Sequence, residues 1–139
     1  PLALAGQTVY YAGPTPAPPG RPVGAIGPTT STRMDAYTPL LLAQGLRAMI
    51  GKGRRGKEVA QAMAGYPCVY FAAVGGAAAL MARCVTACRV VAYADLGTES
   101  IKELTLRELP LVVAMDCHGG DYYDLGPRQY LRQMQKGRG

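Results

Sequence analysis

The 139-residue chain contains no tryptophan, one histidine and four cysteines, and it lacks long hydrophobic runs. No two cysteines have the CxxC spacing of zinc sites and ferredoxin-like clusters, so these patterns are not supported. No apolar run approaches the roughly 20 residues that a membrane span needs. The first residues lack the charged and apolar segments of a secretory signal. Four unpaired thiols fit a reducing compartment, and we expect a cytoplasmic protein without a membrane partner.

Glycine is abundant, but no glycine-rich stretch has the spacing of a nucleotide-binding loop. Gly51–Gly53 has a lysine between its glycines. It lacks the spaced first glycine and the following Ser or Thr of a phosphate-binding loop. Residues 75–79 lack the G-x-G-x-x-G pattern of dinucleotide-binding folds. These absences argue against a nucleotide cofactor.

Composition and charge are those of a basic globular domain. Hydrophobic residues make up 49% of the chain and charged residues 17%, and the net charge is +6. Five cations lie between Arg47 and Lys57. Such a cluster can serve a polyanionic metabolite, nucleic acid or solubility alone. It contains no aromatic residue on which a single-strand binder could stack bases. A metabolite or a solvated surface is therefore favoured over nucleic acid.

Strand-like and helical segments alternate along the chain. Apolar and β-branched runs predict strands at 7–12, 48–50, 68–74, 90–93 and 111–115. Apolar periodicity with Gly or Pro stops predicts helices at 34–44, 57–64, about 75–85 and 99–104. The alternation predicts an α/β fold, one domain over 1–139 with a largely parallel sheet and flanking helices. Residues 126–139 form a basic tail, expected to be a surface helix that frays at Gly137.

Four hydroxyl residues stand directly before an arginine in the segment 29–33, at the start of the predicted helix 34–44. Free backbone N–H groups and the helix dipole favour negative charge at such a position. The guanidinium of Arg33 can hold a carboxylate with two hydrogen bonds. The segment therefore predicts an anion site, although an ordinary hydroxyl N-cap with a solvated arginine explains it equally well.

Three segments occupy the places where ligands bind in parallel α/β sheets, namely the loops that follow strands. These segments are 27–33, 51–56 and 75–76. They offer hydroxyls, the cations Arg33 and Lys52, and glycines that allow close backbone approach. A small dicarboxylate suits this combination, with one carboxylate on each cation.

Six segments, in chain order, resemble the beta-type region of iron–sulfur hydro-lyases, that is, class I fumarases and L(+)-tartrate dehydratases. They are Val9–Pro16 (VYYAGPTP), Gly27–Asp35 (GPTTSTRMD), Ile50–Gly53 (IGKG), Tyr70–Leu80 (YFAAVGGAAAL), Ala94–Ile101 (ADLGTESI) and Val113–Gly119 (VAMDCHG). The resemblance runs from about Gln7 to about Tyr123. It implies a swivelling β/β/α domain, as a beta subunit or a C-terminal region.

The resemblance also implies the chemistry. Enzymes of this type add water to, or remove it from, a small dicarboxylate, such as fumarate and malate, or tartrate and oxaloacetate. The implied cofactor is a four-iron four-sulfur cluster that the alpha-type partner ligates and this chain does not. The chain would be active only with that partner, in a homo- or hetero-oligomer.

By the same resemblance, Thr29 matches a catalytic proton-abstracting threonine, Thr30 a substrate hydrogen-bond donor, and Arg33 and Lys52 two ligands of substrate carboxylates. A hydroxyl is a very weak base near neutral pH. Nearby cations would stabilise an alkoxide, so base chemistry by Thr29 is favoured. The alternative is that Thr29 only hydrogen-bonds the substrate.

The other polar candidates have structural explanations. His118 follows the last predicted strand and is better explained as part of a turn held by Asp116 than as an acid–base group. Glu99 is either a first-turn helix acid or a partner of a cation. Cys84 and Cys88, four residues apart on a predicted helix, are expected to be buried for packing.

Upstream, the family carries a Thr-Ala-Arg-Asp-like motif that nothing here matches, and the chain begins at Pro1. We therefore expect that the chain is trimmed or lacks an upstream segment. We also expect that it is catalytically inactive by itself. A hydro-lyase for another 2-hydroxy acid is a rival within the same chemistry, and two functions of other classes stay open. One is a non-catalytic anion-binding or assembly subunit, and the less favoured one is a basic module that binds nucleic acid.

Overall fold

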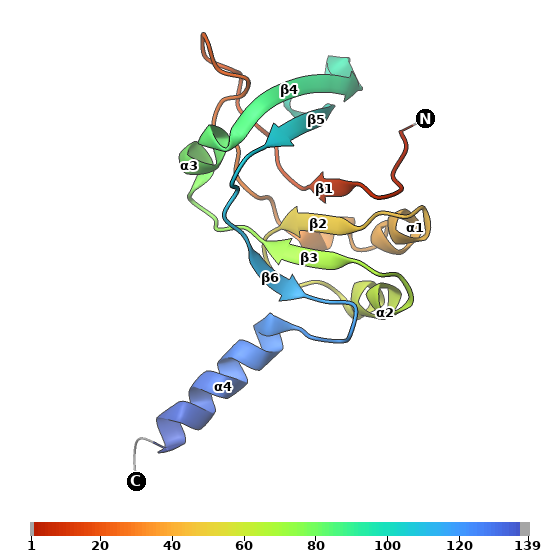
Figure 1. Ribbon diagram of the computed structural model, residues 1–139, viewed down its shortest axis with the longest axis vertical. Coiled ribbons are helices and arrows are strands. Elements are labelled where there is room, and N and C mark those ends of the chain that lie inside the picture. Colours follow the sequence, from red (N-terminus) through yellow and green to blue (C-terminus); the bar gives the residue numbers. More distant parts are fainter. Residues whose placement is uncertain (1, 137–139) are drawn as a thin grey trace.

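The computed structural model describes residues 2–136 (Figure 1). The predicted end of the tail helix at Gly137, and Arg138 of the basic tail, lie outside these residues. The strands are β1 (Thr8–Tyr10), β2 (Ala48–Gly51), β3 (Val69–Ala72), β4 (Val85–Ala92), β5 (Ile101–Leu106) and β6 (Val112–Met115). The helices are the 3-10 helices η1 (Ser31–Met34) and η2 (Ala94–Glu99), with α1 (Thr38–Ala43), α2 (Lys57–Gly65), α3 (Ala78–Arg83) and α4 (Tyr122–Lys136).

The main sheet has the strand order β1-β2-β3-β6. Its first three strands are parallel, and β6 pairs antiparallel with β3. Strands β4 and β5 form a separate antiparallel pair. The predicted α/β class is therefore confirmed, and the predicted parallel arrangement holds for β1, β2 and β3, whereas β6, β4 and β5 pair antiparallel.

The core forms two clusters. One contains residues of α1 and α2 together with side chains of the main sheet, including Met49 and Tyr70. The other joins Ile50 and residues of α3 to β4. Because Met49 and Ile50 are neighbours in β2, their side chains point to opposite faces, so the sheet has a cluster on each face.

The prediction of a helix at 99–104 is wrong, because these residues enter strand β5. Along β5 the exposed residues alternate with partly buried ones, so the burial period is two. Pairing with β4 supplies the backbone partners that override the local helical pattern. Strand β4 also begins at Val85 and is longer than the predicted strand 90–93. The preceding helix α3 is correspondingly shorter than predicted.

The two central cysteines do not share a helix as predicted. Cys84 follows α3, whereas Cys88 lies within β4, and both side chains are half-buried. All four cysteines are free. Only Cys68 is buried, and burial raises the pKa of its thiol to about 11.

The predicted helix 34–44 is also wrong at its start. The hydroxyl segment enters the 3-10 helix η1, a turn follows, and α1 begins only at Thr38. Pro39 explains the delay, because proline is accepted in the first turn of a helix but not one turn further in. Arg33 lies in the last turn of η1. The N-terminal helix dipole that sequence analysis invoked is therefore not available to the site.

Helix α4 extends from the edge of the main sheet beyond β6 and has no buried residue among those described (Figure 1). Over residues 2–136, no helix has the length and apolar character that crossing a membrane requires.

Replacement of Gly51 by alanine is expected to destabilise the protein by about 1–3 kcal/mol, because it overfills a packed site. A Cβ at this position would overlap the hydroxyl oxygen of Ser31 and lie 3.1 Å from the ring of Tyr11. Urea denaturation measures the change in the free energy of unfolding. Gly65→Ala is the matched control, because no atom lies within 4 Å of a Cβ built there, in α2. Equal stability of the two variants would contradict the close approach of η1 and β2.

Candidate functional site

Thr30 and Lys52 pair as neighbours at the carboxyl end of the parallel strands. They form an isolated parallel β-bridge. The backbone N–H of Lys52 donates to the carbonyl of Thr29 (3.2 Å), and the N–H of Ser31 donates to the carbonyl of Lys52 (3.1 Å). The segment 29–31 thus continues the sheet beside Lys52. The structure brings together two of the three loops that the sequence placed at this edge.

The third predicted loop also approaches Lys52. A Cβ built on Gly75 would lie 4.0 Å from Nζ of Lys52. The lysine side chain therefore extends along the loop that follows β3. Arg33 is exposed and lies in η1, directly after this edge. Thr29, Thr30 and Lys52 are exposed as well.

Thr29 is held by two hydrogen bonds to one carbonyl. Its backbone N–H and its Oγ1 both donate to the carbonyl oxygen of Tyr11, at 2.7 and 3.1 Å. The side-chain hydroxyl is therefore oriented, and its remaining lone pairs can accept a hydrogen bond. Donation to a carbonyl favours the protonated hydroxyl, so an alkoxide at Thr29 would require this bond to break.

A buried ion pair that sequence analysis missed lies beneath this surface. Nε of Arg55 donates to Oδ1 of Asp35 at 2.6 Å, and the guanidinium side chain has no exposed surface. Oδ2 of Asp35 accepts the backbone N–H of Gly56 at 2.6 Å. Nη2 of Arg55 also donates to Oγ1 of Thr38. The Asp35 carboxylate therefore joins the end of η1 to the loop that carries Lys52.

Two aromatic rings complete the surroundings of this cation. The guanidinium carbon of Arg55 lies 5.4 Å from the ring centre of Tyr11 and 5.0 Å from that of Tyr70. Cation–π attraction and the ion pair offset the loss of water around the charge. The sequence predicts Arg55 to be part of a basic cluster that either serves a metabolite or faces solvent. Nothing in that cluster's composition distinguishes the buried arginine from its neighbours.

A phenol also connects the two loops. Oη of Tyr70 donates to the carbonyl of Gly53 at 2.9 Å and lies 3.0 Å from Oγ of Ser31. The backbone N–H of Gly53 donates to Oη of Tyr123 at 3.1 Å. Burial raises the pKa of Tyr70 to about 12, so its hydroxyl keeps its proton at neutral pH.

Arg54 ties the same loop to helix α4. It forms an ion pair with Asp124 and donates to the carbonyl of Tyr123 at 2.7 Å. The hydrogen bond from Arg54 lowers the pKa of the Asp124 carboxyl below its usual value. The first turn of α4 is thus part of the support for the Lys52 loop.

The two remaining polar candidates lie in turns. Oδ1 of Asp116 accepts the backbone N–H groups of His118 and Gly120, both at 2.8 Å. These two hydrogen bonds lower the pKa of the Asp116 carboxyl, and the bond from Gly120 has the larger effect. The turn is held through the backbone, and the His118 side chain is exposed. Glu99 lies at the end of η2, where a Cβ built on Gly13 would be 3.8 Å from its Oε1.

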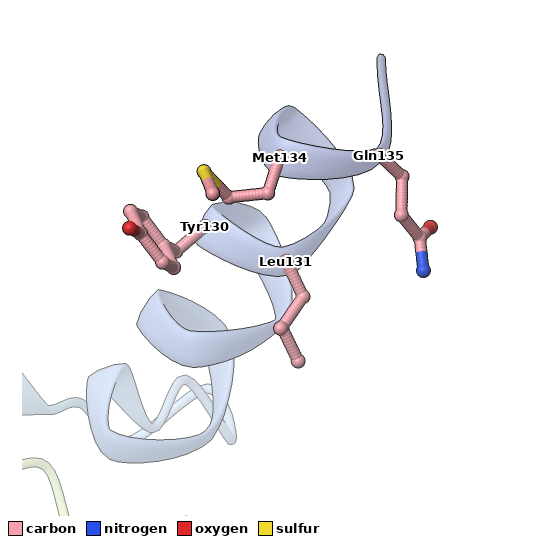
Figure 2. Close-up of a pocket in the computed structure, with 4 residues that line it drawn as sticks. All are labelled: Tyr130, Leu131, Met134 and Gln135. Atoms are coloured by element: carbon pink, nitrogen blue, oxygen red, sulfur yellow. The ribbon is translucent and has the colours of Figure 1, made fainter. Parts of the chain in front are cut away.

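Two surface hollows lie elsewhere on the molecule. The larger, of about 300 Å³, is on the exposed flank of α4 between Tyr130, Leu131, Met134 and Gln135 (Figure 2). A smaller one, of about 90 Å³, lies between β6 and α4. Neither is lined by Thr29, Arg33 or Lys52. The exposed residues of the candidate site therefore lie outside both hollows.

Comparison with known proteins identifies the family of this chain. A family model described as the fumarase C-terminus matches residues 1–126. The chain belongs to the fumarase C-terminal family. This membership confirms the resemblance that the six motifs indicated. Among the described residues, the part of α4 beyond Gly126 lies outside the match.

Curated relatives include both enzyme types. The chain is 35% identical over 125 residues to the anaerobic class I fumarate hydratase of Escherichia coli K12. This alignment covers 88% of this chain and 23% of that protein. It is 35% identical over 141 residues to a putative class I fumarate hydratase of Geobacillus stearothermophilus, in an alignment that covers 98% of this chain and 27% of that protein. It is 41% identical over 104 residues to a putative L(+)-tartrate dehydratase subunit beta of Methanocaldococcus jannaschii, in an alignment that covers 72% of this chain and 53% of that protein. The chain thus spans about a quarter of the fumarate hydratases and half of the tartrate dehydratase subunit.

The described residues do not fit an iron–sulfur cluster. Between residues 2 and 136, no group of three or more His, Cys, Asp or Glu side chains is arranged to hold a metal ion. Cys68 is in the core cluster with Met49, whereas Cys88 packs against the other cluster. The cluster that the resemblance implies would therefore need ligands from another chain or region.

Proposed function

We propose that this chain is the beta-type part of an iron–sulfur hydro-lyase that reversibly adds water to, or removes it from, a small dicarboxylate. The observation that carries the proposal is the pairing of Thr29 and Thr30 with Lys52, beside Arg33, in a member of the fumarase C-terminal family. The substrate class is fumarate and malate, or tartrate and oxaloacetate. The partner would be an alpha-type subunit or region, and it would hold the four-iron four-sulfur cluster.

In dehydration, a hydroxyl leaves one carbon, a proton leaves its neighbour, and a carbon–carbon double bond forms. In this proposal Arg33 and Lys52 bind the two substrate carboxylates through charge-assisted hydrogen bonds. Thr30 donates a hydrogen bond to the substrate. Thr29 receives the proton after its hydroxyl has released the carbonyl of Tyr11 and given up its own proton, which the departing hydroxide takes up to leave as water. The positive charges of Arg33 and Lys52 would stabilise that alkoxide.

Binding of nucleic acid through the basic cluster is less favoured by the contacts of its arginines. Arg55 is buried in the ion pair with Asp35, and Arg54 is paired with Asp124. Arg47 donates to a backbone carbonyl. Three of the five cations in the cluster therefore already have partners within the chain.

An anaerobic assay of the full-length protein with its iron–sulfur-loaded alpha-type partner tests the proposal, with malate, fumarate and L-tartrate as substrates. Arg33→Ala is expected to lower kcat/KM by about 10- to 100-fold, because a hydrogen bond to a charged group is lost. Arg89→Ala is the matched control, since it also removes an exposed guanidinium, one whose partner is Glu103 on β5.

Turnover of one dicarboxylate that depends on Arg33 and not on Arg89 would support the proposal and identify the substrate. Equal activity of the two variants would contradict the role of Arg33. A stable complex of the two proteins without turnover of any of the three substrates would favour an assembly subunit instead.

A further inference from the structure

The side chain of Tyr70 lies under the candidate site without reaching its surface. The residue is in β3 and has 0% exposed area. Its single hydroxyl proton is donated to the carbonyl of Gly53, so the bond with Ser31 must run from Oγ–H of Ser31 to Oη of Tyr70. The result is a directed chain, Ser31 to Tyr70 to Gly53. Hydrogen bonds in such chains polarise and strengthen one another.

The two ends of this chain are neighbours of the residues proposed to bind substrate. Ser31 follows Thr30, and Gly53 follows Lys52. Both polar backbone groups of Gly53 are occupied, because its N–H donates to Oη of Tyr123 while its carbonyl accepts from Tyr70. Gly53 has a φ of +85°, a conformation that only glycine adopts without strain. The direction in which the chain leaves Lys52 is thus set by two phenols.

We propose that the Tyr70 hydroxyl is a positioning group, which fixes the loop of Lys52 relative to the turn of Thr29, Thr30 and Arg33. The inference rests on the proposed function, since it assigns Tyr70 to the alignment of that same site. Tyr70 does not touch substrate in this proposal. It acts through Gly53 and Ser31 on the separation of the groups that bind the two carboxylates.

The hydroxyl can be removed without loss of the ring. The Tyr70 ring faces the guanidinium of Arg55 at 5.0 Å and belongs to the core cluster of α1 and α2. Phenylalanine preserves these contacts, so Tyr70→Phe cuts only the link between the two loops. A displacement of about 1 Å in a reacting group can cost about 100-fold in rate. Because the bridge between Thr30 and Lys52 still holds the backbone, we expect a smaller loss.

Tyr10→Phe provides the matched control. Tyr10 is partly buried, and burial raises its pKa to about 12, as it does for Tyr70. Its hydroxyl donates to the sulfur of Met81 at 3.3 Å. It packs against the other core cluster, and its hydroxyl also lies 3.5 Å from the carbonyl oxygen of Ile26, just before the segment 27–33, so it bonds to neither Ser31 nor Gly53. The two substitutions remove the same atom from similar surroundings, one inside the proposed alignment and one outside it.

The test compares wild type, Tyr70→Phe, Tyr10→Phe and Arg33→Ala in the full-length protein with its alpha-type partner. We expect Tyr70→Phe to lower kcat/KM about tenfold, with similar Tm losses in both tyrosine variants, and Tyr10→Phe to stay within about two-fold of wild type. Amide hydrogen exchange at Gly53 should also be about tenfold faster in Tyr70→Phe than in Tyr10→Phe. If Tyr70→Phe does not fold, Ser31→Ala, which removes the other donor of the chain, takes its place with the same expectations.

The proposal is overturned if Tyr70→Phe keeps wild-type kcat/KM, or if exchange at Gly53 is unchanged. The Arg33→Ala arm separates this failure from failure of the proposed function. Loss of activity in Arg33→Ala with an unaffected Tyr70→Phe removes only the positioning role. Wild-type activity of Arg33→Ala would contradict the assignment of this site to hydro-lyase chemistry. Faster exchange at Gly53 in Tyr70→Phe would then show only a structural link between the two loops. The proposal would be overturned in that case too.

Discussion

Thr29→Ala in the complete enzyme is expected to lower kcat by about 10²- to 10⁴-fold with little change in KM, the size of a lost proton-transfer group. The hydroxyl of Thr29 is oriented by its bond to the carbonyl of Tyr11 and stands beside Lys52 at the sheet edge. Alanine keeps the backbone bonds of this segment and removes only the proposed base. Steady-state kinetics with the substrate identified by the Arg33 experiment measure the effect.

Two further variants of the same segment sharpen this result. Thr32→Ala removes an exposed threonine hydroxyl from the same turn and should leave kcat within about two-fold of wild type. Thr29→Ser keeps a hydroxyl and should restore much of the activity. A near-normal kcat with a raised KM in Thr29→Ala would show that Thr29 binds substrate and that another group moves the proton.

Asp35→Ala is expected to destabilise the protein by about 3–5 kcal/mol, because it leaves the buried guanidinium of Arg55 without its counter-charge. The Arg55 side chain is fully buried and the Asp35 side chain is 7% exposed, so water cannot replace the lost carboxylate. The backbone N–H of Gly56 loses its acceptor as well. Urea denaturation, with the midpoint and slope both determined, measures the change in the free energy of unfolding.

Glu103→Ala is the control for Asp35→Ala, because it removes the carboxylate of an ion pair of similar length. The Arg89–Glu103 pair is 2.8 Å long, and its side chains are 71% and 62% exposed. Exposed pairs contribute about 0–1 kcal/mol, so this variant should be nearly as stable as wild type. A loss for Asp35→Ala no larger than that for Glu103→Ala would show that Arg55 finds another partner or reaches water.

The sequence was sufficient for features that depend on strand polarity. The predicted strand 48–50 and helix 57–64 are confirmed within one or two residues. These elements also predict that the segment 27–33 lies close to Lys52, because the carboxyl ends of parallel strands share one edge of the sheet. The roles of Thr29, Thr30, Arg33 and Lys52 stay predictions.

Features that depend on distant partners could not be predicted. Arg55 is buried because Asp35, Thr38 and Tyr70 surround it, and these residues are separated from it by 15 to 20 positions in the chain. The local sequence of glycines and cations around Arg55 does not predict such long-range contacts. Likewise, residues 101–106 form a strand because β4 pairs with them, although their own composition permits a helix.

The place of β6 in the sheet has a consequence for the order of folding. Strand β6 pairs with β3, but the β4–β5 pair lies between them in the chain, so about 40 residues must be closed into a loop before that contact forms. The connection between β2 and β3 is less than half as long, and we expect this parallel pair to assemble earlier. Tyr123 and Asp124 follow β6, and they reach Gly53 and Arg54 only after it has docked. The loop of Lys52 would therefore acquire its final geometry among the last steps of folding.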